Sequence, residues 1–149
     1  MKPLNIEILK RLTSNVLETT CFLFQSEENP AVKTTENEVS IRINCGTRFS
    51  IYLIFDQKLS TDISCNMLGL SANELTDEIE ESTLKEITNM IGGNFMNSVQ
   101  MPATTKLSLP EVMNGGPEAG QSRPVTDVLS DTVYIENRPV KITLVEYAS

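Results

Sequence analysis

A chain of 149 residues that is 40% hydrophobic and 21% charged has the size and composition of one soluble domain with a sizeable core. Its net charge of −8, without a cluster of lysines and arginines, argues against nucleic acid or a membrane surface as partner. The chain has no histidine, so it lacks the commonest metal ligand and the commonest general base at neutral pH.

Three cysteines, Cys21, Cys45 and Cys65, are spaced too widely for a zinc site or a thioredoxin-like pair, and we expect buried or half-buried thiols. Their odd number and the lack of a secretory segment predict a cytoplasmic protein. No apolar run approaches the length that crosses a bilayer, so we expect no membrane-spanning segment.

The chain begins with a pattern that predicts a helix followed by a hairpin. Apolar residues recur at helical spacing over residues 3–24, Pro3 suits a first turn, and Pro30 should end the helix because it cannot continue one. Alternating apolar residues then predict two strands, over residues 39–43 and 49–55, paired antiparallel across a turn that contains Gly46.

Two helices are expected next. A short amphipathic helix covers residues 59–68 and ends at Gly69, a typical C-terminal cap. A long helix follows over residues 77–97, with Asn73 as its candidate N-cap.

The C-terminal third predicts further strands. Residues 106–109 form a short strand, and residues 110–117 are rich in turn residues. Residues 118–126 have no periodicity and read as a loop or an irregular edge strand. Two β-branched runs, 132–135 and 140–147, predict a second hairpin. The pattern as a whole predicts a single α/β (α+β) domain with an antiparallel β-sheet, two long helices and a short helix.

The order of elements hints at an internal duplication, because each long helix precedes a set of strands. Aligning Asn15 of the first helix with Asn89 of the second places Leu12 opposite Glu86. The first helix therefore has an amide but no carboxylate, so we expect at most one working site.

The long helix places polar residues as regularly as apolar ones. At 100° per residue, one side should be buried; it contains Ile79, Thr83, Leu84, Ile87, Met90, Ile91, Asn94, Phe95 and Ser98. The opposite side carries Ser82, Glu86, Asn89 and Gly93, each three or four residues from the next, which we name the polar ribbon. By spacing alone, a solvated helix face is the favoured interpretation of this ribbon.

A longer motif changes that interpretation. Ser82-x3-Glu86-x2-Asn89-Met-Ile-x-Gly93-Asn, followed by Leu-Ser-Leu-Pro110, resembles the signature of the CheC, CheX and FliY family of response-regulator phosphatases. The length and the single motif are most similar to CheX. One departure is that only about twenty residues separate Asn89 from Pro110, slightly fewer than the family pattern leads us to expect.

The resemblance implies a CheC-like fold and a function. The chain would hydrolyse the aspartyl phosphate of a CheY-like receiver domain, in chemotaxis or a related two-component pathway. Asn89 would position the attacking water, and Glu86 would pair with the receiver's lysine. Ser82, Gly93 and Pro110 would contact the partner, with the small Gly93 giving clearance.

The resemblance also implies that this chain binds no metal or other cofactor, since Mg²⁺ would sit in the receiver, and that it forms a homodimer, with exposed strand edges as one route. Two alternatives remain. One is a non-catalytic module of the same fold that docks a receiver or a flagellar component. The other is an unrelated acidic adaptor, in which the polar ribbon has no function.

Overall fold

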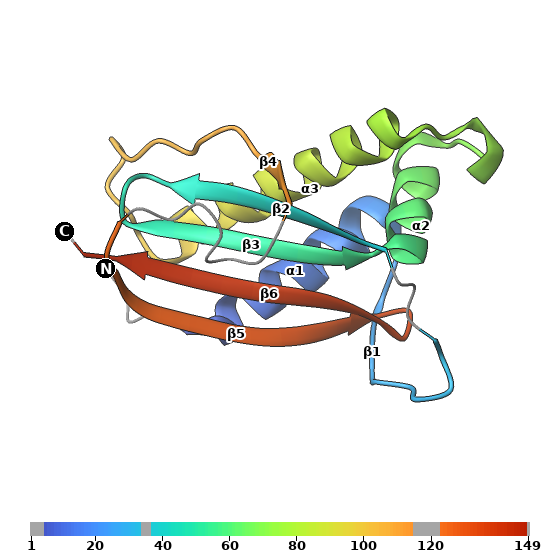
Figure 1. Cartoon of the computed structure of the whole chain (residues 1–149), viewed down its shortest axis with the longest axis horizontal. Helices are drawn as coiled ribbons and strands as arrows, with labels where there is room; N and C mark the ends of the chain where they lie inside the picture. The colour runs from blue at the N-terminus through green and yellow to red at the C-terminus, as the bar shows by residue number, and fades with distance from the viewer. Residues whose placement is uncertain (1–4, 34–36, 115–122, 149) are drawn as a thin grey trace.

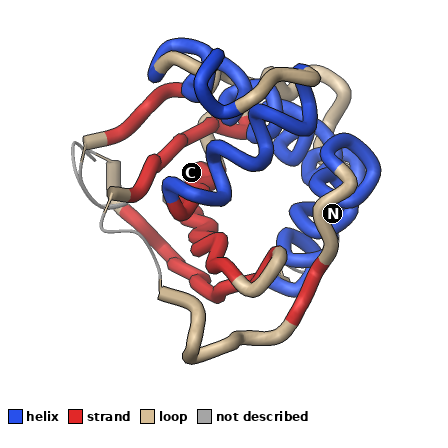
Figure 2. The backbone as a smooth tube through the Cα atoms, turned by 90° about the vertical axis from the view of Figure 1, so that its right-hand side faces the viewer, coloured by secondary structure: helices blue, strands red, loops and turns tan. Residues whose placement is uncertain are grey.

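A six-stranded antiparallel sheet, with strand order β1-β5-β6-β3-β2-β4, forms the centre of the computed structural model, which describes residues 5–33, 37–114 and 123–148. Helices α1 and α3 lie on one face of this sheet, and α2 lies at one end of it (Figure 1, Figure 2). This arrangement confirms the predicted α/β (α+β) class. The elements are α1 (Ile6–Cys21), β1 (Gln25–Ser26), β2 (Glu38–Cys45), β3 (Phe49–Asp56), α2 (Gln57–Leu68), the 3-10 turn η1 (Ala72–Glu74), α3 (Asp77–Ser98), β4 (Glu111–Met113), β5 (Val125–Ile135) and β6 (Arg138–Tyr147).

Helix α1 is shorter than predicted. Asn5 caps its N-terminus by accepting a hydrogen bond from the Glu7 N–H at 2.8 Å. The helix ends at Cys21 because Phe22 adopts a left-handed conformation, with φ of 55°, and its N–H bonds back to the Glu18 carbonyl. The predicted end at residue 24 and the role of Pro30 as terminator were therefore wrong, and Pro3 lies outside the described residues.

The first predicted hairpin is confirmed. Strands β2 and β3 pair antiparallel from Glu38 opposite Asp56 to Cys45 opposite Phe49, and Gly46 makes the turn with φ of 62°. Apolar side chains of β3 are fully buried on the helix-covered face. Tyr52, on the opposite face, is also buried and packs with Val145 and Tyr147, so β3 is covered on both sides.

The start of α3 differs from the prediction. Gly69 ends α2 with φ of 68°, as expected. However, Thr76 rather than Asn73 is the N-cap of α3, accepting from the Ile79 N–H at 3.2 Å. Asn73 lies inside η1, at whose start the Ser71 N–H and hydroxyl both donate to the Glu74 carboxylate, at 3.0 Å and 2.7 Å.

The C-terminal strands are longer and differently placed than predicted. Residues 106–109 contain only an isolated bridge, between Leu107 and Cys45, and β4 forms inside the predicted turn region by pairing with β2. Strand β5 begins at Val125 rather than at residue 132, and residues 118–122 of the unassigned segment lie outside the described residues. The second hairpin is confirmed, with Glu136 and Asn137 both left-handed at its turn.

The core lies between the sheet and helices α1 and α3. Its apolar side chains come from both helices and from the central strands β2, β3 and β6, and Phe49 meets Phe95 of α3 edge to face, with 6.1 Å between ring centroids. Cys21 and Cys45 are buried, and burial raises the pKa of these thiols to about 11 and about 12. Within the described residues, no helix is both long enough and apolar enough to cross a membrane.

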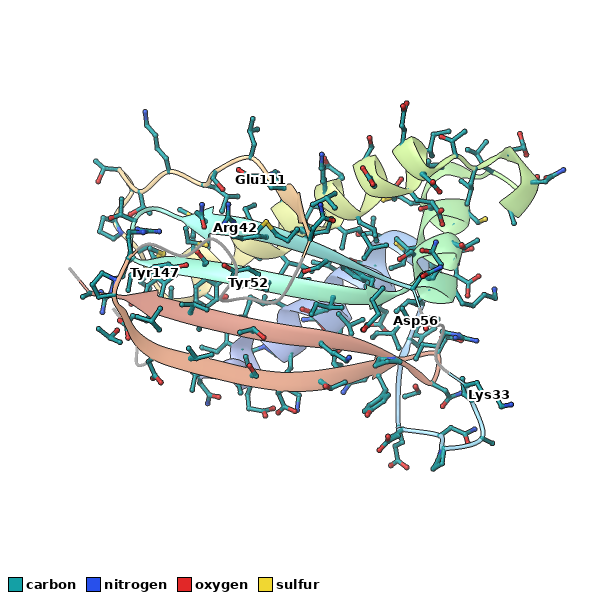
Figure 3. All side chains as sticks on the ribbon, viewed as in Figure 1. Lys33, Arg42, Tyr52, Asp56, Glu111 and Tyr147 are labelled. Carbon is teal, nitrogen blue, oxygen red and sulfur yellow. The ribbon has the colours of Figure 1, made fainter. Side chains whose placement is uncertain are left out.

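A buried ion pair joins the two hairpins at the end where α2 begins. Asp56, labelled in Figure 3, caps α2 by accepting from the Leu59 N–H and also accepts from Arg138 Nη1 at 2.9 Å. Its side chain is 1% exposed. Because its charge is desolvated, this carboxylate depends on Arg138 far more than a surface acid depends on its partner.

Replacing Asp56 with Asn should lower the free energy of unfolding by about 1.5–2 kcal/mol, since the amide keeps an oxygen for the cap but loses the charge that faces Arg138. Urea unfolding measures this change. The matched control is Asp62→Asn, which removes an exposed i,i+4 pair with Lys58 and should cost less than about 0.5 kcal/mol. Equal costs for the two variants would contradict the structural role of Asp56.

Candidate functional site

Helix α3 buries one side against α1, α2 and β2, much as the sequence pattern predicts. Four predicted members of the buried side are wrong or only partly right: Asn94 is exposed, and Ile79, Met90 and Ser98 are half-buried. Two buried residues, Thr88 and Gly92, were missed. Thr88 can be buried because its hydroxyl donates to the Leu84 carbonyl at 2.8 Å.

The polar ribbon faces away from the core. Ser82, Glu86 and Asn89 are exposed, and Gly93 is half-buried. A rise of about 1.5 Å per residue puts Glu86 and Asn89 one turn apart on the same side of the helix. The expectation that the ribbon meets solvent is therefore confirmed.

Glu86 and Asn89 are both available to a partner. Among the described residues, neither side chain makes a hydrogen bond or an ion pair with another part of the chain. A carboxylate can accept hydrogen bonds only, whereas a carboxamide both donates and accepts. The two groups together therefore offer a negative charge and, about one turn away, an amide that can orient a small polar molecule.

The two adjacent glycines of α3 have different environments. A Cβ on Gly92 would lie 3.0 Å from a methyl group of Leu107 and 3.3 Å from a methyl of Ile43, so this glycine lets α3 pack closely on β2. A Cβ on Gly93 would meet nothing within 4 Å. Internal packing explains the first glycine but not the second.

Replacing Gly93 with Ala should therefore raise the free energy of unfolding by about 0.5–1 kcal/mol, the usual difference in helix propensity. Gly92→Ala is the matched control, and its gain should be smaller or reversed because Leu107 and Ile43 must shift. Denaturant unfolding of both variants measures this difference. A destabilised Gly93 variant would mean that packing within the chain requires this glycine.

Pro110 lies in a segment that is held against the edge of β2. Ser108 donates its N–H to the Asn44 carbonyl and accepts the Asn44 N–H on its hydroxyl, both at 2.9 Å. On the other side of Pro110, Glu111 pairs with Arg42 at 3.0 Å, and Figure 3 shows these two side chains facing each other. Strand β4, which starts directly after Pro110, contacts α3.

Leu109 is a surface residue that belongs to the Leu-Ser-Leu-Pro110 motif but was assigned no role from the sequence. Its side chain is 84% exposed, the largest exposed fraction among the large hydrophobic residues of the described chain. The two flanking anchors, at Ser108 and Glu111, explain why it points outward. The pairing of β4 with β2, which begins two residues later at Glu111, was not predicted from the local sequence pattern.

Helix α1 carries no equivalent of the ribbon. Asn15 is exposed, like Asn89, but Leu12 is half-buried and packs against the core. An apolar side chain thus stands where α3 has its carboxylate. In the described part of the chain, no cluster of three or more acidic, cysteine or histidine side chains could hold a metal ion.

Several solved structures with this architecture are described as chemotaxis proteins. CheX from Vibrio vulnificus is 20% identical, with 95% of each chain covered and a TM-score of 0.67. CheX from Desulfovibrio desulfuricans is 18% identical, with 94% of this chain and 97% of that chain covered and a TM-score of 0.66. The CheX-CheY-BeF3-Mg²⁺ complex from Borrelia burgdorferi contains a chain that is 15% identical, with coverages of 96% and 97% and a TM-score of 0.66.

These similarities establish a shared fold. A match at the sequence level goes further: the family model described as chemotaxis phosphatase CheX matches residues 39–127, which include the polar ribbon and Pro110. The chain belongs to the CheX family of chemotaxis phosphatases. A comparison with curated protein sequences found no significant match.

Proposed function

We propose that this chain hydrolyses the aspartyl phosphate of a CheY-like response regulator and thereby ends a chemotaxis or related two-component signal in the cytoplasm. The observation that carries the proposal is the pair of free, exposed side chains on α3, Glu86 and Asn89, within a chain of the CheX family. The known complex of a structurally similar CheX with CheY supports the choice of partner.

Asn89 is the residue assigned to the reacting water. Hydrolysis of an acyl phosphate needs a water in line with the leaving oxygen, and holding it there supplies a large part of the rate enhancement. The Asn89 carboxamide can accept one hydrogen bond from this water and donate another to a phosphoryl oxygen. It does not take up a proton, so its contribution is positional.

Glu86 is the residue assigned to orientation. It is an exposed carboxylate one turn from Asn89, so it can pair with the lysine that the family resemblance implies beside the receiver's phosphoaspartate. That pairing would set the direction from which Asn89 enters the receiver's site. Mg²⁺ is expected in the receiver's own site, where it neutralises phosphoryl charge, and no residue of this chain is assigned to it.

Three further residues are assigned to the docking surface. Ser82 extends the ribbon toward the start of α3, and Gly93 leaves open space at its other end because no neighbouring atom lies where a Cβ would stand. Pro110 precedes the strand that contacts α3. We assign these small or rigid residues to the part of the surface that would contact the receiver around Glu86 and Asn89.

A homodimer is also proposed. Within the described residues, the two-residue β1 covers only the end of β5, pairing at Tyr134 and Ile135, so most of the outer edge of β5 is free for another strand. Sedimentation velocity of the purified protein tests this proposal, and a monomer at all concentrations would contradict it.

The phosphatase activity is tested by mixing the chain with a phosphorylated CheY protein of the same organism in Mg²⁺ and measuring phosphate release. The chain should accelerate release well beyond the receiver's own rate. Complex formation without acceleration would instead favour a non-catalytic docking module.

A further inference from the structure

A groove opens beside the polar ribbon, between the last turn of α2 and the first half of α3. Its volume is about 440 Å³, within the range of about 300–1,000 Å³ typical of ligand sites. Helix α2 contributes Met67 and Leu68, and α3 contributes Ile79 and Thr83. Figure 1 shows these two helices side by side at the end of the sheet where α2 lies.

The walls of this groove are largely apolar. The side chains of Met67, Leu68 and Ile79 have no hydrogen-bond donor, and their single acceptor is the weakly accepting sulfur of Met67. The Thr83 hydroxyl already donates to the Ile79 carbonyl at 2.8 Å, so its hydrogen is not available to an occupant of the groove. Leu68 is 47% exposed, so a large apolar side chain at the groove's edge meets water in the isolated chain.

The rim of the groove is negatively charged. Glu78 and Glu86 line it, both are exposed, and neither forms an ion pair with another described residue. Helix α3 as a whole carries five carboxylates and one lysine. An occupant with a basic residue beside an apolar one would match both the rim and the walls.

The groove is continuous with the proposed site. Ser82 and Glu86 belong to both the polar ribbon and the groove lining. Ser82 lies seven residues before Asn89, so the centre of the groove is about 10 Å from Asn89 along the helix. A receiver whose phosphoaspartate site admits Asn89 would therefore bring a neighbouring segment over the groove.

We propose that this groove receives an apolar side chain of the phosphorylated receiver, from a segment that carries Lys or Arg next to it and lies about 10 Å from the phosphoaspartate. This inference rests on the proposed function. It assigns Met67, Leu68, Ile79 and Glu78 to recognition of the receiver, whereas Asn89 acts on the reaction.

Leu68→Asn tests the inference, because it removes the exposed apolar wall at a position whose half exposure makes misfolding a small risk. The KM for the phosphorylated CheY protein should rise about tenfold while kcat stays unchanged. The matched control is Phe24→Asn, between α1 and β1, where the side chain is 49% exposed and belongs to neither α2 nor α3; its KM should not change.

Glu78→Gln tests the charged rim. Its KM should rise about threefold at low salt, and the difference should disappear near 1 M salt because the interaction is screened. The control is Glu27→Gln, an exposed acid outside the helices, which should leave KM unchanged at low salt. Equal effects of the two variants would mean that the net negative charge of the chain, and not the position of Glu78 at the groove, attracts the receiver. That result would contradict the inference.

Direct binding separates this inference from the proposed function. Calorimetric titration with the CheY protein loaded with Mg²⁺ and beryllofluoride, a mimic of phosphoaspartate, gives a Kd that does not depend on turnover. If the wild-type chain did not accelerate phosphate release but Leu68→Asn still bound the receiver more weakly, the docking role of the groove would stand and the phosphatase function would be disproved. If Leu68→Asn left Kd, KM and turnover unchanged, the role of the groove in receiver binding would be disproved, and the phosphatase function would stand. The same would hold if Leu68→Asn lost a homodimer while Kd stayed unchanged, and the groove would then be assigned to a second copy of the chain. The absence of both binding and turnover would overturn both.

Discussion

Asn89→Ala should lower the rate of phosphate release by about 10²–10³-fold while the protein remains folded. The magnitude is that seen when one positioned hydrogen-bond group is removed from a reacting centre. Folding should be unaffected because the Asn89 side chain is exposed and makes no hydrogen bond within the described chain. Alanine is also a better helix former than asparagine.

The measurement is single-turnover phosphate release from the phosphorylated CheY protein, at saturating enzyme. A separate series at lower enzyme concentrations gives the concentration at which the rate is half-maximal. This concentration should change little, since Asn89 is assigned to the reacting water rather than to docking. Asn15→Ala is the matched control, because Asn15 is the aligned, exposed amide of α1 and lacks a carboxylate neighbour. Full activity in the Asn89 variant would remove the proposed mechanism, and a loss in the Asn15 variant would indicate a second working site.

Glu86→Ala should weaken docking of the phosphorylated receiver by about 30-fold, the effect expected for about 2 kcal/mol when one partner of a desolvated charge pair is truncated. The effect should exceed that of any surface acid, because the receiver's lysine would be left without a counter-charge in a closed interface. In the isolated chain Glu86 has no ion pair to lose among the described residues, so stability should be unchanged.

The beryllofluoride-loaded CheY protein provides the titration partner for this measurement. Glu18→Ala is the control, since it removes an exposed acid from α1 and makes the net charge one unit less negative, as Glu86→Ala does. A CheY variant with Ala in place of the lysine should bind wild-type chain and Glu86→Ala with similar affinity, because the pair is then absent in both. Additive losses from the two substitutions would show that Glu86 contacts another group.

The elements with a strong local pattern were predicted well. Alternating apolar residues located β2 and β3, and the apolar and polar sides of α3 located the polar ribbon, because side-chain periodicity directly determines which face of an element can be buried. The end of α1 was missed since it depends on the left-handed conformation of Phe22, a residue type that rarely adopts it. Strand β4 was missed since its three residues form a strand only by pairing with β2.

The residues around the ribbon show the same division. The sequence alone does not distinguish the two adjacent glycines of α3. The structure does, because Leu107 and a residue of β2 pack against Gly92, whereas Gly93 faces open space. The groove next to Glu86 joins residues of α2 and α3, and neither helix alone predicts it.

The amino-acid sequence by itself determined the class of fold, the single carboxylate and amide pair on one helix face, and the resemblance to response-regulator phosphatases. These properties depend on the order and spacing of residues within one element. Only the tertiary structure decided that this pair has no partner among the described residues, that β4, directly after Pro110, contacts the same helix, and that an apolar, acid-rimmed groove adjoins it. Those properties depend on which distant segments come into contact, and local periodicity contains no information about that.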